Sequence, residues 1–132
     1  VRVIAPDKTV WDAEAEEVIL PSTTGQLGIL SGHAPLMTAL DVGVMRVRPA
    51  KDWVAIALMG GFAEVDNDEV TILVRGAERG DSIDQDDARS AFETAQATMT
   101  ATSSDDRQAA LQARQALQKA RARLQAAGGS VG

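Results

Sequence analysis

The residues WVAIALMGGFAEVDNDEVTILV (53–74) show most directly what the first part of this 132-residue chain folds into. Their apolar runs are short or alternate with polar residues, as in strands that bury one face. The pair Gly60-Gly61 marks a bend in the chain. Asp66-Asn67-Asp68 is a tight-turn sequence of the kind that joins two antiparallel strands. These residues therefore predict strands over 53–59, 62–65 and 70–74, with a hairpin turn between the last two.

The same pattern extends outward over residues 1–80. Apolar runs end at Pro6, Pro21 and Pro49, and separate strands are expected over 34–40 and 43–48. About six to ten short strands with a turn every 8–12 residues and no helical period favour a β-sandwich or flattened barrel. Residues 1–80 are expected to form an all-β domain with its core between two sheets.

After residue 80 the apolar residues follow a helical period, so residues 81–132 are expected to form a hairpin of two helices. The first helix has N-cap candidates in residues 81–84, with Ser82 and Gln85 spaced as in a capping box. Small polar residues over 100–106 break the pattern, and a second helix is expected over 107–127. Its apolar seam consists of Ala110, Ala113, Leu117, Ala120, Leu124 and Ala127. A buried Ala contributes much less than the roughly 1.5–3 kcal/mol of a buried Leu, so the hairpin is expected to detach easily from the sandwich.

Charge is distributed unevenly in this acidic chain, whose net charge is −6. Residues 1–80 carry a net charge of −5, residues 81–102 carry −4, and residues 103–132 carry +3. The basic residues of the last segment are Arg107, Arg114, Lys119, Arg121 and Arg123. They fit either a solvated face that complements the helix dipole or a surface that binds an acidic partner. Nucleic acid is not expected as a partner, because the rest of the chain is acidic and few aromatic residues are present.

Enzymatic chemistry finds little support in the sequence. The chain has no Cys, and its single histidine, His33, is not accompanied by carboxylates at metal-ligand spacing. Phosphate-binding and nucleophile-elbow motifs are absent as well. We therefore expect no catalytic residue, no metal and no cofactor. No apolar run approaches the roughly 20 residues that span a bilayer, so a soluble protein is expected.

Residues 20–36, LPSTTGQLGILSGHAPL, resemble the signature of the epsilon subunits of rotary F-type ATP synthases. The family's next Leu and Gly are present as Leu40 and Gly43, and its paired glycine turn is present as Gly60-Gly61. The resemblance covers most of residues 1–80 and is greatest to cyanobacterial and chloroplast members. It implies a ten-stranded β-sandwich followed by a C-terminal helical hairpin.

The resemblance also implies a function and a set of partners. The family's epsilon subunit is a non-catalytic part of the central stalk that couples rotation and inhibits ATP hydrolysis. Its sandwich binds the gamma subunit and the ring of c subunits, and its basic second helix contacts the beta and alpha subunits of the catalytic head. The implied location is peripheral, on the cytoplasmic or stromal face of an energy-transducing membrane such as the thylakoid. The implied loop that faces the c ring and gamma comprises Gly25, Gln26, Leu27, Gly28, Ile29, Leu30, Ser31, Gly32 and His33.

Some bacterial members bind ATP through the motif Ile/Leu-Asp-x-x-Arg-Ala at the start of the first helix. Here Ile83-Asp84 is present, but Arg89 follows Asp84 by five residues instead of three. In the other register Asp86 pairs with Arg89, but polar residues occupy the Ile/Leu and Ala positions. Residues five apart on a helix are rotated by roughly 140°, so they do not converge on one ligand. ATP binding is not expected.

Three functional classes therefore remain: a stalk subunit of an ATP synthase, a β-sandwich adaptor with a helical tail, and an enzyme. Co-purification with a gamma subunit separates the first two. The third requires a deep pocket that holds a titratable group with a shifted pKa.

Overall fold

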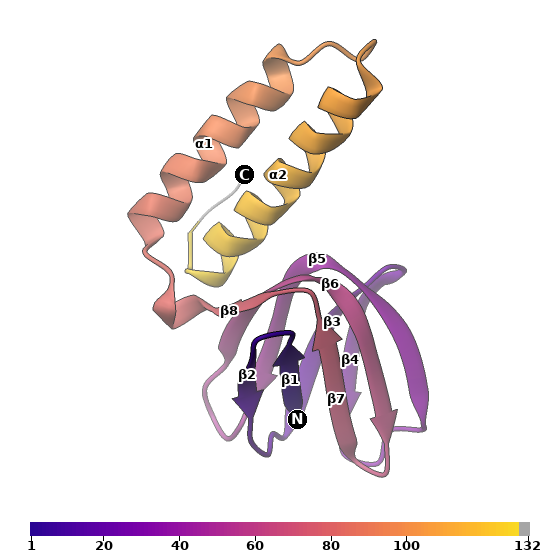
Figure 1. Cartoon of the computed structure of the whole chain (residues 1–132). Helices are drawn as coiled ribbons and strands as arrows, with labels where there is room; N and C mark the ends of the chain where they lie inside the picture. The colour runs from indigo at the N-terminus through magenta and orange to yellow at the C-terminus, as the bar shows by residue number, and fades with distance from the viewer. Residues whose placement is uncertain (130–132) are drawn as a thin grey trace.

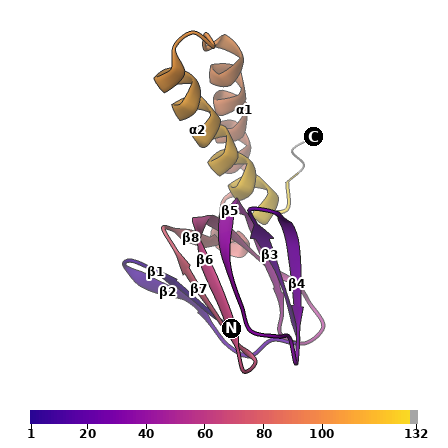
Figure 2. The same ribbon diagram turned by 90° about the vertical axis from the view of Figure 1, so that its right-hand side faces the viewer.

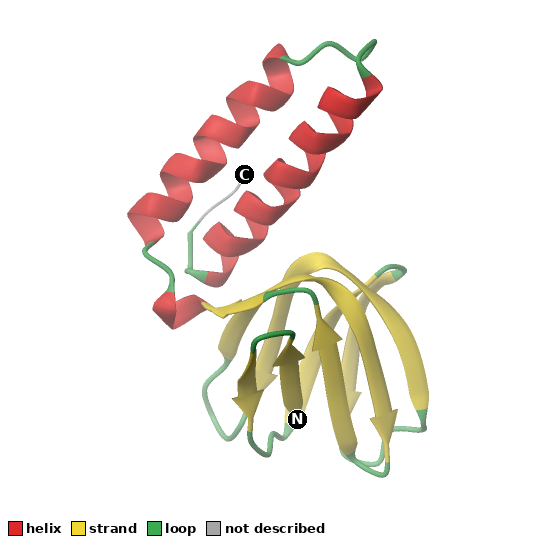
Figure 3. Cartoon of the chain, in the orientation of Figure 1, coloured by secondary structure: helices red, strands yellow, loops and turns green. Residues whose placement is uncertain are grey.

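The computed structural model describes residues 1–129, which form a β-domain followed by a helical hairpin (Figure 1). Figure 3 shows that the strands precede the helices in the chain and that the two kinds of element do not mix. The strands are β1 (Arg2–Ala5), β2 (Lys8–Asp12), β3 (Glu17–Ser22), β4 (Gly25–Leu30), β5 (Leu36–Arg48), β6 (Val54–Asp66), β7 (Glu69–Val74) and β8 (Ala77–Arg79). A 3-10 turn, η1 (Gly80–Ser82), leads to the helices α1 (Gln85–Ala101) and α2 (Arg107–Ala126).

The strands pair in the order β2-β1-β7-β6-β5-β3-β4, and β8 pairs with β6. All the pairs are antiparallel except β1 with β7. The sheet folds over on itself along the long strands β5 and β6, and the main core lies between its two halves (Figure 2). Its most deeply buried side chains are Val3, Leu20, Met45, Val47, Ile56, Leu58, Val65 and Ile72. The expected all-β architecture is confirmed.

The expected number of ten strands is wrong, because the described residues form eight. Two pairs of expected short strands are continuous: β5 and β6 each have 13 residues, and their pairing keeps one register from Leu36 to Val47. Gly60 and Gly61 have φ angles of +83° and +155°, which bend β6 without ending it. A Cβ on Gly61 would lie 2.1 Å from the carbonyl oxygen of Leu73, so the close approach of β7 also requires glycine there.

Pro21 does not end its strand, contrary to expectation. The pairing of β3 with β5 shifts register between Ile19 and Ser22, so Pro21 lies where the ladder is already interrupted. A Cβ on Gly43 of β5 would come within 2.9 Å of the Pro21 Cβ. Gly43 therefore leaves room for the proline ring inside a continuous strand.

Acidic N-caps start both helices. Asp84 accepts a hydrogen bond from the Asp87 amide, and Asp106 accepts one from the Ala109 amide, each at 3.1 Å. The expected second helix is confirmed to within one residue. The Ser82 capping box is not formed, because Ser82 lies in η1 and donates to the carbonyl of Arg79 at 2.8 Å.

A second, smaller core holds the hairpin on the sandwich. The C-terminal part of α2 packs on β5 and β6, whereas the turn between the two helices points away from the sheet (Figure 1). Val44 and Ala57 come from the sheet, and Phe92 comes from α1. Ala122 and Ala126 of α2 are buried outside the expected seam. Helix α2 therefore has two buried stripes, one of which the apolar seam did not reveal.

We predict that residues 1–80 fold alone as an all-β domain, because every residue of the main core lies within them. Removal of the hairpin uncovers Val44 and Ala57, so we expect the fragment to be less stable than the full chain by about 1.5–3 kcal/mol, the value of one buried aliphatic side chain. Circular dichroism and thermal unfolding of the fragment and the full chain test this. A disordered spectrum would contradict the prediction.

Candidate functional site

The basic residues of α2 do not form one surface. Arg107, Arg114, Lys119 and Arg121 are exposed. Arg123 is only 28% exposed, and its Nε and a terminal nitrogen each lie 3.1 Å from Oε2 of Glu78 in β8. The structure therefore separates Arg123 from the other four basic residues.

The helix dipole accounts for only one of these five residues. Arg123 lies in the last turn of α2, where a positive charge is stabilising. Arg107 is the first residue of α2, where the positive end of the dipole disfavours it. The remaining basic residues thus fit a surface for an acidic partner better than a complement to the dipole.

The segment expected as a loop is mostly strand. Residues 25–30 form β4, an edge strand that pairs only with β3, and residues 31–35 alone connect it to β5. Continuous pairing from Ser22↔Gly25 to Glu17↔Leu30 keeps the segment extended, so its glycines do not open a loop. Because six strand residues span about 17 Å, Gly25 and His33 lie at opposite ends of the domain.

The loop that contains His33 is fixed to the turn between β6 and β7. The Gly32 amide donates to Oδ1 of Asp68 at 2.6 Å, and Nδ1 of His33 donates to the carbonyl of Ala34 at 2.7 Å. Both Asn67 and Asp68 have positive φ angles, +50° and +62°, as a two-residue hairpin turn requires. The predicted hairpin turn is confirmed, and His33 has a structural role in its loop.

An exposed apolar row crosses the outer face of the sandwich. Leu73 of β7 lies beside Ile4 of β1 and opposite Phe62 of β6, and Phe62 lies opposite Ala39 of β5. Phe62 is 58% exposed and Leu73 is 54% exposed. Met37, the neighbour of Ala39 two residues away on β5, is 70% exposed. We call Ile4, Leu73, Phe62, Ala39 and Met37 the apolar row.

The apolar row borders a groove of about 660 Å³, whose walls include Met59, Gly60, Gly61 and Arg75. None of the expectations from the sequence pointed to this surface. The pattern that could have revealed it is the alternation in β7, where Leu73 falls on the outward side with Thr71 while Val70, Ile72 and Val74 point inward. Such a residue is ordinary when it stands alone, but a contiguous exposed apolar patch like the apolar row is typical of a contact surface.

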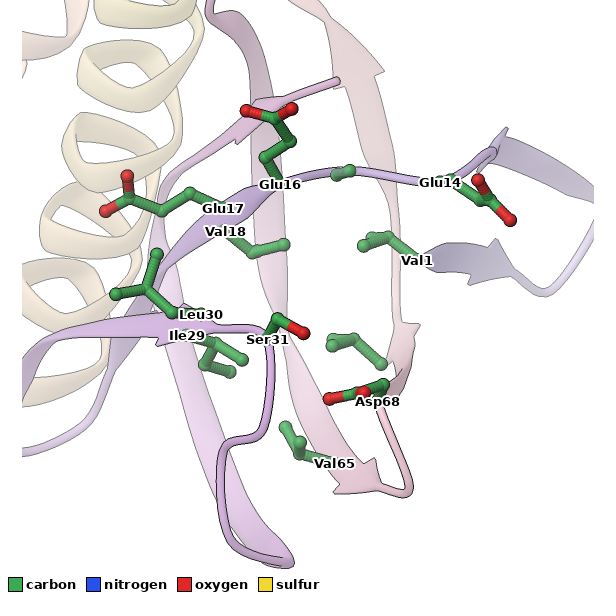
Figure 4. Close-up of a pocket in the computed structure, with 12 residues that line it drawn as sticks. Val1, Glu14, Glu16, Glu17, Val18, Ile29, Leu30, Ser31, Val65 and Asp68 are labelled. Carbon is green, nitrogen blue, oxygen red and sulfur yellow. The ribbon is translucent and has the colours of Figure 1, made fainter. Parts of the chain in front are cut away.

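A second pocket, of about 370 Å³, opens between Val1, the start of β3, the end of β4 and the turn between β6 and β7 (Figure 4). Glu14, Glu16, Glu17 and Asp68 lie around it, and aliphatic side chains of the core form its floor. Figure 4 shows the three glutamates on the segment that leads into β3.

Two of these glutamates form ion pairs with Arg48. Its guanidinium nitrogens lie 2.8 Å from Glu16 and 3.3 Å from Glu17, and its Cζ lies 5.5 Å from the centre of the Trp53 ring. The hydrogen bonds that Arg48 donates to Glu16 and then to Glu17 raise its pKa, so it stays charged and anchors this end of β5. Glu16 and Glu17, two of the four acidic residues around the pocket, are therefore held in ion pairs.

Two of the four residues of the degenerate nucleotide motif have structural roles. Ile83 is buried in the second core, and Asp84 caps α1. Asp86 lies exposed in the first turn of α1, and Arg89 is half-buried on the next turn. An open groove of about 500 Å³ between the helices begins beyond them, lined by Ser90, Ala91, Thr94, Ala95, Thr98, Ala116, Lys119, Ala120 and Arg123.

Two further features of residues 1–129 bear on other functions. No group of three or more His, Cys, Asp or Glu side chains in this part of the chain is placed to hold a metal ion. Neither of its helices is long and apolar enough to cross a membrane.

Known families match both parts of the chain. The family described as the ATP synthase Delta/Epsilon chain, beta-sandwich domain, matches residues 1–80, and the long alpha-helix domain of the same chain matches residues 81–128. The chain belongs to the ATP synthase delta/epsilon family. The resemblance seen in the sequence is confirmed.

Curated relatives are similar to the chain over nearly its whole length. The ATP synthase epsilon chain of Trichodesmium erythraeum is 70% identical over 132 residues, which cover 99% of this chain and 96% of that relative. The ATP synthase epsilon chain of Thermosynechococcus vestitus is 71% identical, with the same coverage.

Solved structures share the fold at low identity. A chain of the Euglena gracilis mitochondrial ATP synthase (OSCP/F1/c-ring) has a TM-score of 0.79 at 24% identity, and the match covers 96% of this chain and 78% of that one. A chain of the Tetrahymena thermophila mitochondrial ATP synthase central stalk and c-ring has a TM-score of 0.53 at 16% identity, covering 61% and 66%. Both likenesses support the same arrangement of strands and helices.

We predict that this family member binds ATP with a dissociation constant no tighter than about 1 mM, or about −4 kcal/mol. Ile83 and Asp84 are committed to the core and to the cap, so they are not available to a ligand. Titration calorimetry of the full chain with ATP measures this. Saturation at micromolar ATP would contradict the prediction.

Proposed function

We propose that this chain is the non-catalytic epsilon subunit in the central stalk of a proton-translocating ATP synthase. In this role it couples rotation between the c ring and the catalytic head and restrains ATP hydrolysis through its C-terminal helices. The observation that carries the proposal is the identity of about 70% to ATP synthase epsilon chains over 99% of the chain. Two surfaces of the molecule suit the two parts of this role.

The apolar row is the proposed contact with the gamma subunit. Stable interfaces have an apolar centre that is enriched in aromatic residues and Met and depleted of charge. The row provides Phe62, Leu73 and Met37 at exposures above one half, and the adjacent groove can receive side chains of the partner. The edge strand β4 is the proposed contact with the c ring, which follows the resemblance of residues 25–33.

Replacement of Phe62 by Asp tests the gamma contact. A charge at the centre of an apolar interface should cost about 2 kcal/mol, which weakens binding to the isolated gamma subunit close to 30-fold. The matched control is Leu111→Asp on α2, because Leu111 is 50% exposed but lies outside the row and outside residues 25–33. Binding is measured by calorimetry for both variants. Equal binding by the wild type and Phe62→Asp would refute the assignment of the row to gamma.

The exposed arginines of α2 are the proposed inhibitory surface, and an acidic face of a beta subunit is their partner. Arg107, Arg114 and Arg121 are spaced by seven residues, so they follow one side of the helix over about 21 Å. Exposed ion pairs contribute only about 0.2–1 kcal/mol each, so the three must act together.

Replacement of Arg107, Arg114 and Arg121 by Ala should weaken inhibition of the head's ATPase by roughly fivefold to 150-fold, corresponding to about 1–3 kcal/mol of lost docking. Salt should reduce the difference, because it screens exposed charges. The matched control replaces the exposed neutral residues Gln108, Gln112 and Gln115 of the same helix by Ala. If the arginine variant inhibits as well as its control at low ionic strength, insertion of the helix rather than its charge stops rotation.

The proposed location follows from the same role. The chain would be held at the cytoplasmic or stromal face of an energy-transducing membrane by its partners, and the cyanobacterial relatives suggest the thylakoid. A fractionation experiment tests this location: the chain should be lost from washed thylakoid membranes when the catalytic head is stripped off.

A further inference from the structure

Three consecutive residues at the junction of the two domains contact other elements of the molecule: Glu78, Arg79 and Gly80. Oε2 of Glu78 accepts hydrogen bonds from Arg123 of α2. Arg79 donates to both carboxylate oxygens of Asp81, at 3.1 and 2.8 Å, and its guanidinium lies 5.1 Å from the centre of the Trp11 ring in β2. Gly80 touches the end of α2 through its backbone.

The Gly80 contact is close enough to depend on the absence of a side chain. A Cβ on Gly80 would lie 1.9 Å from the carbonyl oxygen of Ala126 and 3.2 Å from that of Ala55. Both neighbours are backbone atoms, so they cannot move aside as a flexible side chain would. The end of α2 is therefore seated against the junction and against β6 together.

Glu78 lies in a basic environment. Lys8, Arg75 and Lys119 line the same cleft of about 300 Å³ between the sandwich and α2, and Asp7 is the other acidic residue there. Glu78 thus presents to α2 a carboxylate of the kind that an acidic partner would present.

Apart from the ion pair, the contact between α2 and the sandwich buries little apolar area. Helix α2 contributes Leu124, Ala120, Ala122 and Ala126 to the buried part of the second core, so three of the four side chains are single methyl groups. A partly buried ion pair therefore makes up a larger share of the docking free energy here than it would in a core of large side chains.

We propose that the Glu78–Arg123 ion pair sets the fraction of molecules whose hairpin is docked on the sandwich. Glu78 and the acidic surface of the catalytic head then compete for the basic helix α2. While the pair is formed, α2 is held away from that surface. The second part of this inference rests on the proposed inhibitory function, and the first part does not.

The chain has no Cys, so two can be introduced as labelling sites without interference. Spin labels at Lys51→Cys and Gln115→Cys, both exposed, report the distance between the sandwich and α2 in the full chain by pulsed electron paramagnetic resonance. A docked hairpin gives one narrow distance distribution, and a detached hairpin gives a broad one. Glu78→Gln should lower the ratio of docked to detached molecules by about twofold to fivefold at low salt and have little effect at high salt.

Two further variants interpret this result. Asp12→Asn removes one carboxylate from an exposed ion pair with Arg2 on the surface of the sandwich domain. It changes the net charge by the same amount as Glu78→Gln and should leave the distances between the labels unchanged. Gly80→Ala should detach α2 at every salt concentration, because it acts by steric conflict.

Inhibition of the ATPase of the catalytic head tests the proposed inhibitory function separately from the role of the ion pair in docking. Glu78→Gln should inhibit about twofold to fivefold more strongly than Asp12→Asn, because more of its helices are free to bind. An unchanged distance distribution in Glu78→Gln overturns the inference, whatever the ATPase shows. A broadened distribution with unchanged inhibition supports the role of the ion pair in docking and contradicts the proposed inhibitory function.

Discussion

The pairing of β5 with β6 is the interaction on which the rest of the molecule depends. Each strand has 13 residues, and the bend at Gly60-Gly61 lets the pair pass from one half of the sheet to the other in one register. This one ladder encloses the main core, places Phe62 on the outer face and supplies Val44 and Ala57 as the seat for α2. Loss of the bend would therefore disturb both proposed contact surfaces at once.

The two cores differ in the size of their side chains, and this gives the two domains different stabilities. Ile, Leu, Val and Met side chains fill the sandwich, whereas the hairpin is held largely by Ala, one Leu and Phe92. Because buried apolar area scales with side-chain size, the hairpin opens at a lower cost than the sandwich unfolds. The coupling role proposed for the sandwich and the regulatory role proposed for the hairpin thus fit the different stabilities of the two domains in 132 residues.

Sequence periodicity predicted what is local and missed what depends on packing between distant segments. The turn at Asn67-Asp68 and the start of α2 at Arg107 follow from local turn and capping chemistry, and the structure has both. Strands β5 and β6 were each expected as two shorter strands because a glycine looks like a break in the sequence, whereas Gly43 and Gly61 are where another backbone or the Pro21 ring comes close. The apolar row was missed because it is assembled from four strands whose order the sequence does not reveal.

The basic residues of α2 form one group in the sequence, but helix geometry directs them to different faces. Residues seven apart are offset by only about 20°, so Arg107, Arg114 and Arg121 stay on the solvent side along the whole helix. Arg123 follows Arg121 by two residues, a rotation of about 200°, which turns it toward Glu78 and the sandwich. A third direction carries the Ala and Leu seam that meets α1. One helix of 20 residues therefore has separate faces for its helical partner, for its own sandwich and for the proposed acidic surface of the catalytic head.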